Sequence, residues 1–170
     1  MTGEKTSQAH AWGHYAPSGF KRGIVDASRG GNSFAARPAV WLNPGPVDIE
    51  VNGFRARLNP RDNLSEKRAL VRPDALERRE LDYLVDALSP ESCFIDIGAN
   101  FGLYALTLAA APSGPGRIVA VEPQPEMLSR LLFNISTSGF DDRIDVRPVA
   151  VAGRARSPLP RTPTIAARVA

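Results

Sequence analysis

The feature that most constrains the fold is a run of small residues between two apolar segments. The run is Gly98-Ala99-Asn100-Phe101-Gly102, and it follows the segment 93–97, which is apolar except for Asp96. The segment 103–111 after it is apolar throughout its length apart from Thr107. A short apolar run, a glycine turn and a longer apolar segment are typical of a strand that passes directly into a helix. The sequence therefore predicts a strand at 93–97, buried on both faces, and a helix at 103–111.

The same order of strand and helix repeats further along the chain. Residues 118–121 form an apolar run that ends at Glu122, and Pro125 opens a helical pattern that Gly139 ends. A third strand is expected at 144–151, weakened by Pro148. Strands that alternate with helices of this length form parallel sheets with right-handed crossovers. We therefore predict an α/β fold with a Rossmann-like sheet.

The residues before this sheet predict a hairpin and one more helix. Alternating apolar residues over 47–58, with Asn52-Gly53 between the two halves, are typical of an N-terminal β-hairpin. Residues 74–88 predict a helix with Asp74 as its N-cap and Glu77 as the capping-box partner. Residues 1–46 are rich in Gly, Pro, Ser and Arg and predict a flexible N-terminal arm.

Charge and composition exclude several classes of partner. The formal net charge is +3, but the basic excess lies at the two ends, and residues 41–153 carry a net charge of −4. We therefore expect no nucleic-acid partner. Arg55, Arg57 and Arg61 are expected on a solvated face of the hairpin, with contact to an anionic substrate as the alternative. No apolar run is long enough for a membrane span or a secretion signal, and the single Cys93, expected to be buried, fits a cytoplasmic protein.

Two acidic residues stand where neighbouring parallel strands are expected to end. Asp96 is near the end of the first strand, and Glu122 follows the second. A carboxylate at the position of Glu122 accepts hydrogen bonds from ribose hydroxyls, and free amides at the start of the helix after Gly102 would face the same ligand. This arrangement predicts a site for a cofactor that contains adenosine.

The charge of Asp96 indicates which cofactor is bound. A dinucleotide site has three spaced glycines and faces a pyrophosphate, whereas this chain has Asp96 before Gly98 and no third glycine. A carboxylate there repels pyrophosphate and suits the ammonium end of S-adenosylmethionine. The predicted cofactor-binding residues are therefore Asp96, Gly98, Ala99, Asn100, Gly102 and Glu122. No catalytic residue is assigned. His10 and His14 have helical spacing but no nearby acidic or thiol partner, so no metal site is expected.

Over residues 47–153 the sequence resembles the FkbM family of S-adenosylmethionine-dependent methyltransferases. The matching stretches are Leu58 to Lys67 with Glu80, Phe94 to Leu103, Val121 to Glu126, Asn134, and Val149 to Gly153. The resemblance implies O-methylation of a hydroxyl on a small molecule or a sugar. It also implies that Asp96, Gly98, Asn100 and Gly102 line the methionine part of the cofactor, and that Glu122 holds the ribose.

The resemblance ends at Gly153, and a segment rich in Pro and Arg follows. We therefore expect a partial methyltransferase domain at 47–153, a sheet that is incomplete at the C-terminus, and a disordered tail at 154–170. Two alternatives to an active methyltransferase stay open. One is a non-catalytic remnant or interaction fragment that self-associates through an exposed sheet edge. The other, less favoured, is an NAD-dependent oxidoreductase.

Overall fold

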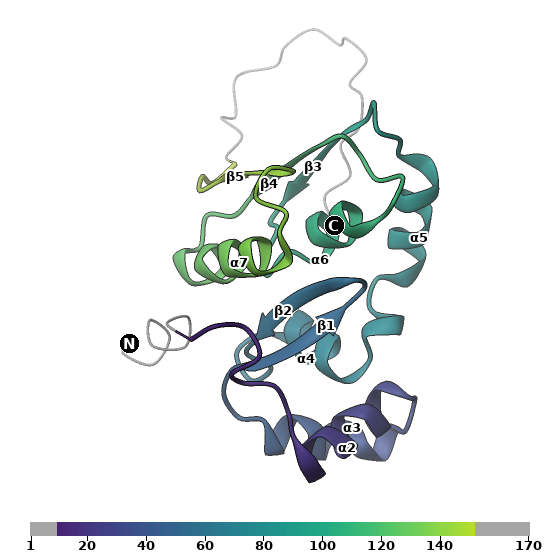
Figure 1. The fold of residues 1–170 in the computed structure, drawn as a ribbon, viewed down its shortest axis with the longest axis vertical. Coiled ribbons are helices and arrows are strands. Elements are labelled where there is room, and N and C mark those ends of the chain that lie inside the picture. Colours follow the sequence, from purple (N-terminus) through teal and green to yellow (C-terminus); the bar gives the residue numbers. More distant parts are fainter. Residues whose placement is uncertain (1–9, 152–170) are drawn as a thin grey trace, which may run out of the picture.

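The computed structural model describes residues 10–151 and contains a three-stranded parallel sheet (Figure 1). Its strands are β3 (Cys93–Ile97), β4 (Arg117–Val121) and β5 (Ile144–Arg147), in the order β3-β4-β5. Asp96 pairs with Ala120 and Ile97 with Val121, so β3 and β4 end at the same edge. The predicted α/β fold with a Rossmann-like sheet is confirmed. The third strand is shorter than predicted and ends at Arg147, immediately before Pro148.

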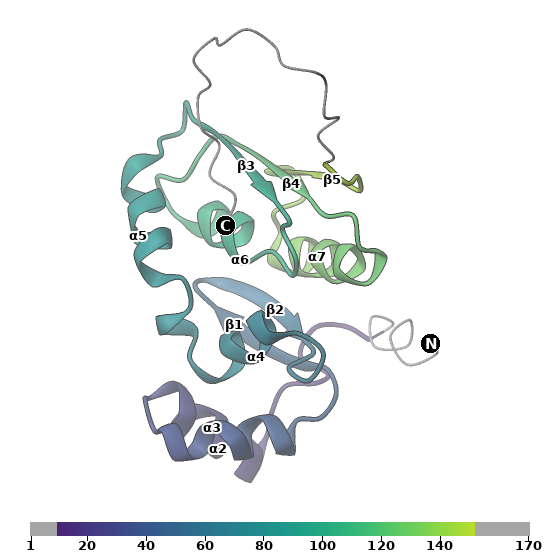
Figure 2. The same ribbon diagram turned by 180° about the vertical axis from the view of Figure 1, so that it is seen from behind.

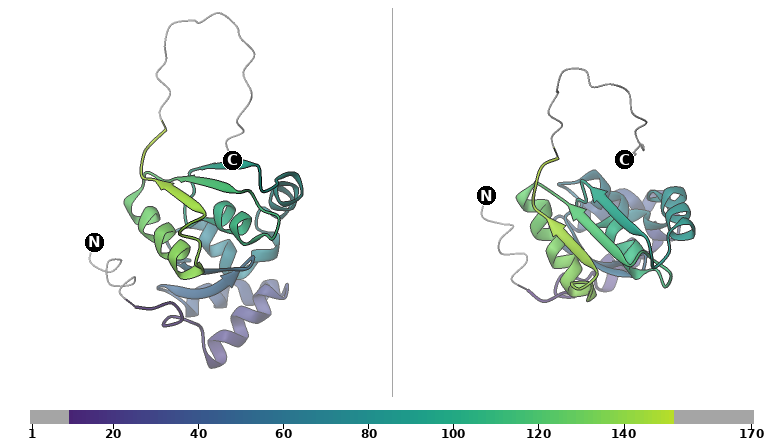
Figure 3. Two further views of the ribbon diagram at one scale, coloured as in Figure 1. Left: turned by 45° about the horizontal axis from the view of Figure 1, so that its top comes forward. Right: turned by 90° about the horizontal axis from the view of Figure 1, so that it is seen from above.

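Helices α6 (Leu103–Ala110) and α7 (Pro125–Ser138) follow β3 and β4 and lie on the same face of the sheet (Figures 1 and 3). Helix α7 starts at Pro125 and ends at Gly139, which has a left-handed φ of 74°, as predicted. Leu106 of α6 and Leu131 of α7 are fully buried in the core between sheet and helices. Within residues 10–151, no helix combines the length and the apolar character needed to cross a bilayer.

The other face of β3 is open, so the prediction that this strand is buried on both faces is wrong. Ile95 is 58% exposed and Ile97 is 43% exposed, and Cys93, expected to be buried, is exposed as well. Within the described part of the chain, the helices after β3 and β4 cover only one side of the sheet (Figure 2). In the same residues β3 has a paired neighbour on one side only, β4.

The predicted β-hairpin forms a second layer beneath α6 and α7 (Figure 1). Its strands β1 (Val47–Val51) and β2 (Phe54–Leu58) pair antiparallel, with Val51 opposite Phe54. Asn52 and Gly53 both have positive φ, as a two-residue hairpin turn requires. The hairpin is thus confirmed.

A buried ion pair links the two strands of this hairpin, and a hydrogen bond from the same arginine links the hairpin to α7. The Arg57 guanidinium donates to both carboxylate oxygens of Asp48, at 2.7 and 2.9 Å, and Arg57 is only 2% exposed. The expectation that Arg57 lies on a solvated face is therefore wrong. The Arg57 amide donates to the side-chain oxygen of Asn134 on α7 (2.7 Å), and the Asn134 amide group donates to the Phe101 carbonyl (3.0 Å). Asn134 therefore joins the hairpin to the turn after β3.

Helix α4 (Leu64–Val71) packs on β2, and below it α2 (Gly19–Arg29) and α3 (Ser33–Leu42) pack against each other and against α4 (Figure 1). Val25 and Ala39 are buried in the same core as the hairpin strands, and the Ser28 hydroxyl donates to the Val71 carbonyl at 3.0 Å. The prediction of a flexible arm at 1–46 is therefore wrong for residues 19–42. The predicted tail at 154–170 lies outside the described residues.

The predicted helix at 74–88 is divided in two. Pro73–Ala75 forms the short 3-10 helix η1, and α5 (Arg78–Ala87) begins after Glu77, which has a left-handed φ of 49°. The Glu77 side chain makes no capping bond, so the predicted capping box of Asp74 and Glu77 is wrong. A non-glycine residue in this conformation is costly and breaks the helical path.

We expect Arg57→Ala to lower the free energy of unfolding by about 3–5 kcal/mol, because it leaves the Asp48 carboxylate buried without its countercharge. Urea denaturation followed by circular dichroism measures this. Arg78→Ala is the matched control. It removes an ion pair with Asp82 whose side chains are about 60% exposed, and it should change stability by roughly 0.5 kcal/mol or less. Equal effects of the two substitutions would contradict the structural role of Arg57.

Candidate functional site

The two acidic residues singled out in the sequence lie at the same edge of the sheet. Asp96 is the penultimate residue of β3, and Glu122 directly follows β4. They are 8% and 6% exposed. Asp96 Oδ2 accepts from the Ala105 amide in the first turn of α6 (3.2 Å), and Glu122 Oε2 accepts from the Asn100 amide (2.8 Å). Both carboxylates therefore border the turn at 98–102.

The amides of this turn are used within the protein. The Gly98 and Ala99 amides donate to the Val121 carbonyl at 2.9 and 3.0 Å. The Phe101 amide donates to the Asn100 side-chain oxygen (2.8 Å), and the Gly102 amide donates to the Ala99 carbonyl (2.8 Å). The expectation of free amides concerned the start of α6 after Gly102, where the Ala105 amide donates to Asp96. What the site offers to a ligand is carboxylate oxygen, an acceptor of hydrogen bonds.

Gly98 and Gly102 are required for different reasons. Gly102 has φ +98°, and a Cβ there would lie 2.6 Å from Leu106 Cδ1 and 2.8 Å from Leu131 Cδ1, so neither conformation nor space admits a side chain. Gly98 has φ +82°, but no atom lies within 4 Å of the position that its Cβ would take. The backbone at Gly98 is therefore open to a ligand.

Burial strongly affects the ionisation of Asp96. Loss of solvent is the main cause that raises its pKa to about 6; the Ala105 amide opposes this rise, and the nearby Glu122 carboxylate adds to it. Within residues 10–151 no group donates a hydrogen bond to Asp96 Oδ1. In the same residues, every side-chain oxygen that is fully buried has a hydrogen-bond partner, so Oδ1 is not fully buried. Oδ1 is therefore accessible to solvent, and a cation that binds it would favour the ionised form.

Glu122 is held in place by two backbone donors. Besides the Asn100 amide on Oε2, the Gln124 amide donates to Oε1 at 2.9 Å. Each carboxylate oxygen has two lone-pair sites, so one acceptor position on each oxygen remains for a ligand. Two free acceptor positions on one rigid carboxylate match a pair of neighbouring hydroxyl groups.

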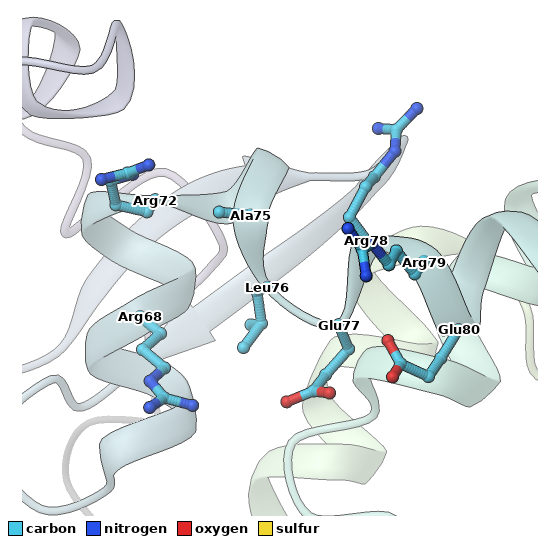
Figure 4. A pocket seen from close by; sticks show the side chains of 8 residues that line it. All are labelled: Arg68, Arg72, Ala75, Leu76, Glu77, Arg78, Arg79 and Glu80. Carbon is cyan, nitrogen blue, oxygen red and sulfur yellow. The ribbon is translucent and has the colours of Figure 1, made fainter.

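An open cavity of about 580 Å³ lies between α4, η1 and the start of α5 (Figure 4). The Glu77 and Glu80 carboxylates point to the same side of it (Figure 4). Tyr104 of α6 lies close to this cavity and to Asp96. Burial and the carboxylates of Glu77, Glu80 and Asp96 together raise the pKa of Tyr104 to about 12. The Tyr104 hydroxyl therefore keeps its proton at neutral pH. The residues that line the cavity are Arg68, Arg72, Ala75, Leu76, Glu77, Arg78, Arg79 and Glu80.

Sequence reasoning assigned no role to Asn63, which contacts the turn, or to Glu66 and Arg130. Asn63 donates to the Asn100 side-chain oxygen at 3.0 Å, and beneath it the buried Glu66 forms an ion pair with Arg130 of α7. Desolvation raises the pKa of Glu66 and outweighs the opposing effect of Arg130. The spacing Asn63-x-x-Glu66 is a helix-start pattern that would have predicted α4. The contact with Asn100 has no local sequence signal.

The two histidines lie next to each other. The rings of His10 and His14 stack at 4.1 Å between centroids. Residues 10–151 contain no group of three or more His, Cys, Asp or Glu side chains arranged to hold a metal ion.

No protein-family model matches the chain, and no curated protein matches it. Several solved structures are similar to it. TYW2 from P. horikoshii in complex with MeSAdo has 18% identity and a TM-score of 0.49, over 61% of this chain and 36% of that one. TYW2 from M. jannaschii in complex with AdoMet has 15% identity and a TM-score of 0.46, over 59% and 42%. The M. jannaschii tRNA m1G37 methyltransferase has 16% identity and a TM-score of 0.46, over 64% and 31%. The chain thus spans less than half the length of each.

We expect Asp96→Asn to stabilise the ligand-free chain at pH 7 by roughly 1–3 kcal/mol. The raised pKa means that the folded state keeps the Asp96 proton between about pH 4 and 6 while the unfolded state loses it. The wild type therefore loses stability as pH rises through this window, and the Asn variant is spared that loss. Urea denaturation of both proteins at pH 4 and pH 7 measures the difference, which should be near zero at pH 4. A variant that is less stable than wild type at pH 7 would contradict this assignment.

Proposed function

We propose that this chain binds S-adenosylmethionine and belongs to a methyltransferase that acts on a hydroxyl of a small molecule or sugar. The observation that supports this best is the pair of buried carboxylates, Asp96 and Glu122, on either side of a turn whose own amides are already used. The donor cofactor and the FkbM type of acceptor are both part of the proposal.

The donor and acceptor groups of the site fit this cofactor. S-adenosylmethionine carries a sulfonium and an ammonium, and its ribose hydroxyls donate hydrogen bonds. The site offers Asp96 Oδ1 and the free lone pairs of Glu122, which are acceptors. A pyrophosphate would need free amide donors and would be repelled by Asp96. These groups therefore disfavour the NAD-dependent oxidoreductase.

Each residue of the site has a distinct task in this proposal. Asp96 holds the ammonium end, and Glu122 holds the ribose hydroxyls. Gly98 lets the ligand approach the backbone, while Ala99, Asn100 and Gly102 keep the turn in shape. When bound, the cofactor supplies an electrophilic methyl group. The protein contributes by orienting this group toward the acceptor, which is the main requirement of such a displacement.

The cavity between α4 and α5 is the proposed entrance for the acceptor. Glu77 and Glu80 in its wall are hydrogen-bond acceptors suited to the hydroxyls of a sugar or similar small molecule. The net charge of −4 over residues 41–153 argues against RNA as the acceptor, although four arginines line the cavity itself beside Glu77 and Glu80. The solved structures above include one named as a tRNA methyltransferase, and its acceptor is not transferred to this chain.

The second candidate is a non-catalytic remnant or interaction fragment. The open face of β3, with Ile95 and Ile97 exposed, favours this alternative, because apolar sheet surface promotes association. In this case self-association through β3 would occur without any affinity for the cofactor. Ligand binding therefore separates the two candidates.

Isothermal titration with S-adenosylhomocysteine should give measurable binding to the wild type. Asp96→Asn and Glu122→Gln should each weaken the affinity by roughly 10- to 100-fold, since each removes a charged hydrogen bond. Glu126→Gln is the matched control, because Glu126 is an exposed carboxylate in the first turn of α7, and it should leave the affinity unchanged. Absence of heat at high protein concentration would favour the remnant, and binding of NAD in its place would favour the oxidoreductase.

A further inference from the structure

Asn63 links α4 to the turn of the proposed cofactor site through both ends of one amide group. Its oxygen caps α4 by accepting from the Ser65 amide (2.8 Å) and the Glu66 amide (3.4 Å). Its nitrogen donates to Asn100 Oδ1 at 3.0 Å and lies 3.5 Å from Met127 Sδ. The orientation of the amide is therefore determined on both sides.

Asn100 is the residue of the turn that most needs such support. Its φ is 53°, in the left-handed region that non-glycine residues rarely adopt. Its own amide donates to Glu122, and its side-chain oxygen also accepts from the Phe101 amide at 2.8 Å. A shift of Asn100 would therefore move a donor that holds the Glu122 carboxylate.

The start of α4 is itself firmly anchored. Glu66, three residues after Asn63, accepts from the Asn59 amide and forms a buried ion pair with Arg130 of α7. Glu66 is fully buried and Arg130 is 2% exposed. Because this ion pair joins α4 to α7, it fixes the position of Asn63 at the start of α4 relative to the turn.

We propose that Asn63 is a positioning residue of the cofactor site. It holds the Asn100 side chain, and through it the turn and the Glu122 carboxylate, in the geometry that binds S-adenosylmethionine. Asn63 acts through Asn100 and does not itself contact the cofactor. This inference rests on the function proposed above.

Asn63→Ser separates this role from helix capping. Serine caps helices about as well as asparagine but is too short to reach Asn100. Asn32→Ser is the matched control, since Asn32 is an exposed N-cap of α3 whose side chain accepts from the Phe34 amide. Both variants should keep the thermal stability of the wild type. Only Asn63→Ser should weaken S-adenosylhomocysteine binding, by roughly five- to tenfold, the effect of one neutral hydrogen bond.

Two further measurements test whether the effect passes through Asn100. In the ligand-free chain, hydrogen exchange at the Asn100 and Phe101 amides should be roughly fivefold faster in Asn63→Ser and unchanged in Asn32→Ser. Glycine tolerates the positive φ of Asn100, so Asn63→Ser should cause no further loss of affinity in an Asn100→Gly background.

The outcomes separate this inference from the proposed function. If the wild type binds S-adenosylhomocysteine and Asn63→Ser binds equally well, Asn63 has no positioning role and the proposed function stands. An additive loss in the Asn100→Gly background overturns the path through Asn100. If the wild type binds no S-adenosylhomocysteine, the proposed function is wrong, and the cofactor role of Asn63 is overturned with it.

Discussion

The end of β4 determines the shape of the turn that follows β3. The Gly98 and Ala99 amides both donate to the Val121 carbonyl, and the Asn100 amide donates to the carboxylate of the next residue, Glu122. The turn is therefore defined only when β3 and β4 are paired in their native register. Helix α6 leaves directly from this turn, so its direction, and its packing against α5, the sheet and the hairpin, depend on the same three bonds.

The site concentrates negative charge in a place where water is scarce. Asp96 and Glu122 are both more than 90% buried, and the Glu122 carboxylate raises the cost of ionising Asp96. Backbone amides compensate part of this cost, but a cation is the partner that such a pair lacks. A protein selected only for stability would carry neutral side chains here. Residues that oppose stability in the free protein are typical of sites that are completed by a ligand.

Local patterns in the sequence predicted the hairpin, the three parallel strands and α7, because alternation, turn residues and helix stops are short-range signals. They also predicted that Asp96 and Glu122 meet, since parallel strands end at one edge. Other features depend on tertiary contacts. Pro38 lies inside α3 and is unfavourable for a helix, so the sequence did not predict α3, which is stabilised by tertiary packing. The burial of Arg57 follows from the position of Asp48 on the paired strand, and the exposure of Ile95 depends on what covers the sheet.

The position of Asn134 makes the folded chain incompatible with a modification that its sequence would permit. Asn134-Ile135-Ser136 is an acceptor sequon for N-linked glycans. The side-chain nitrogen that would carry the sugar donates to the Phe101 carbonyl, and Asn134 is fully buried. A glycan attached to the unfolded chain would keep Asn134 from this place and would separate the hairpin from α7. Glycosylation at this sequon and the native packing therefore exclude each other.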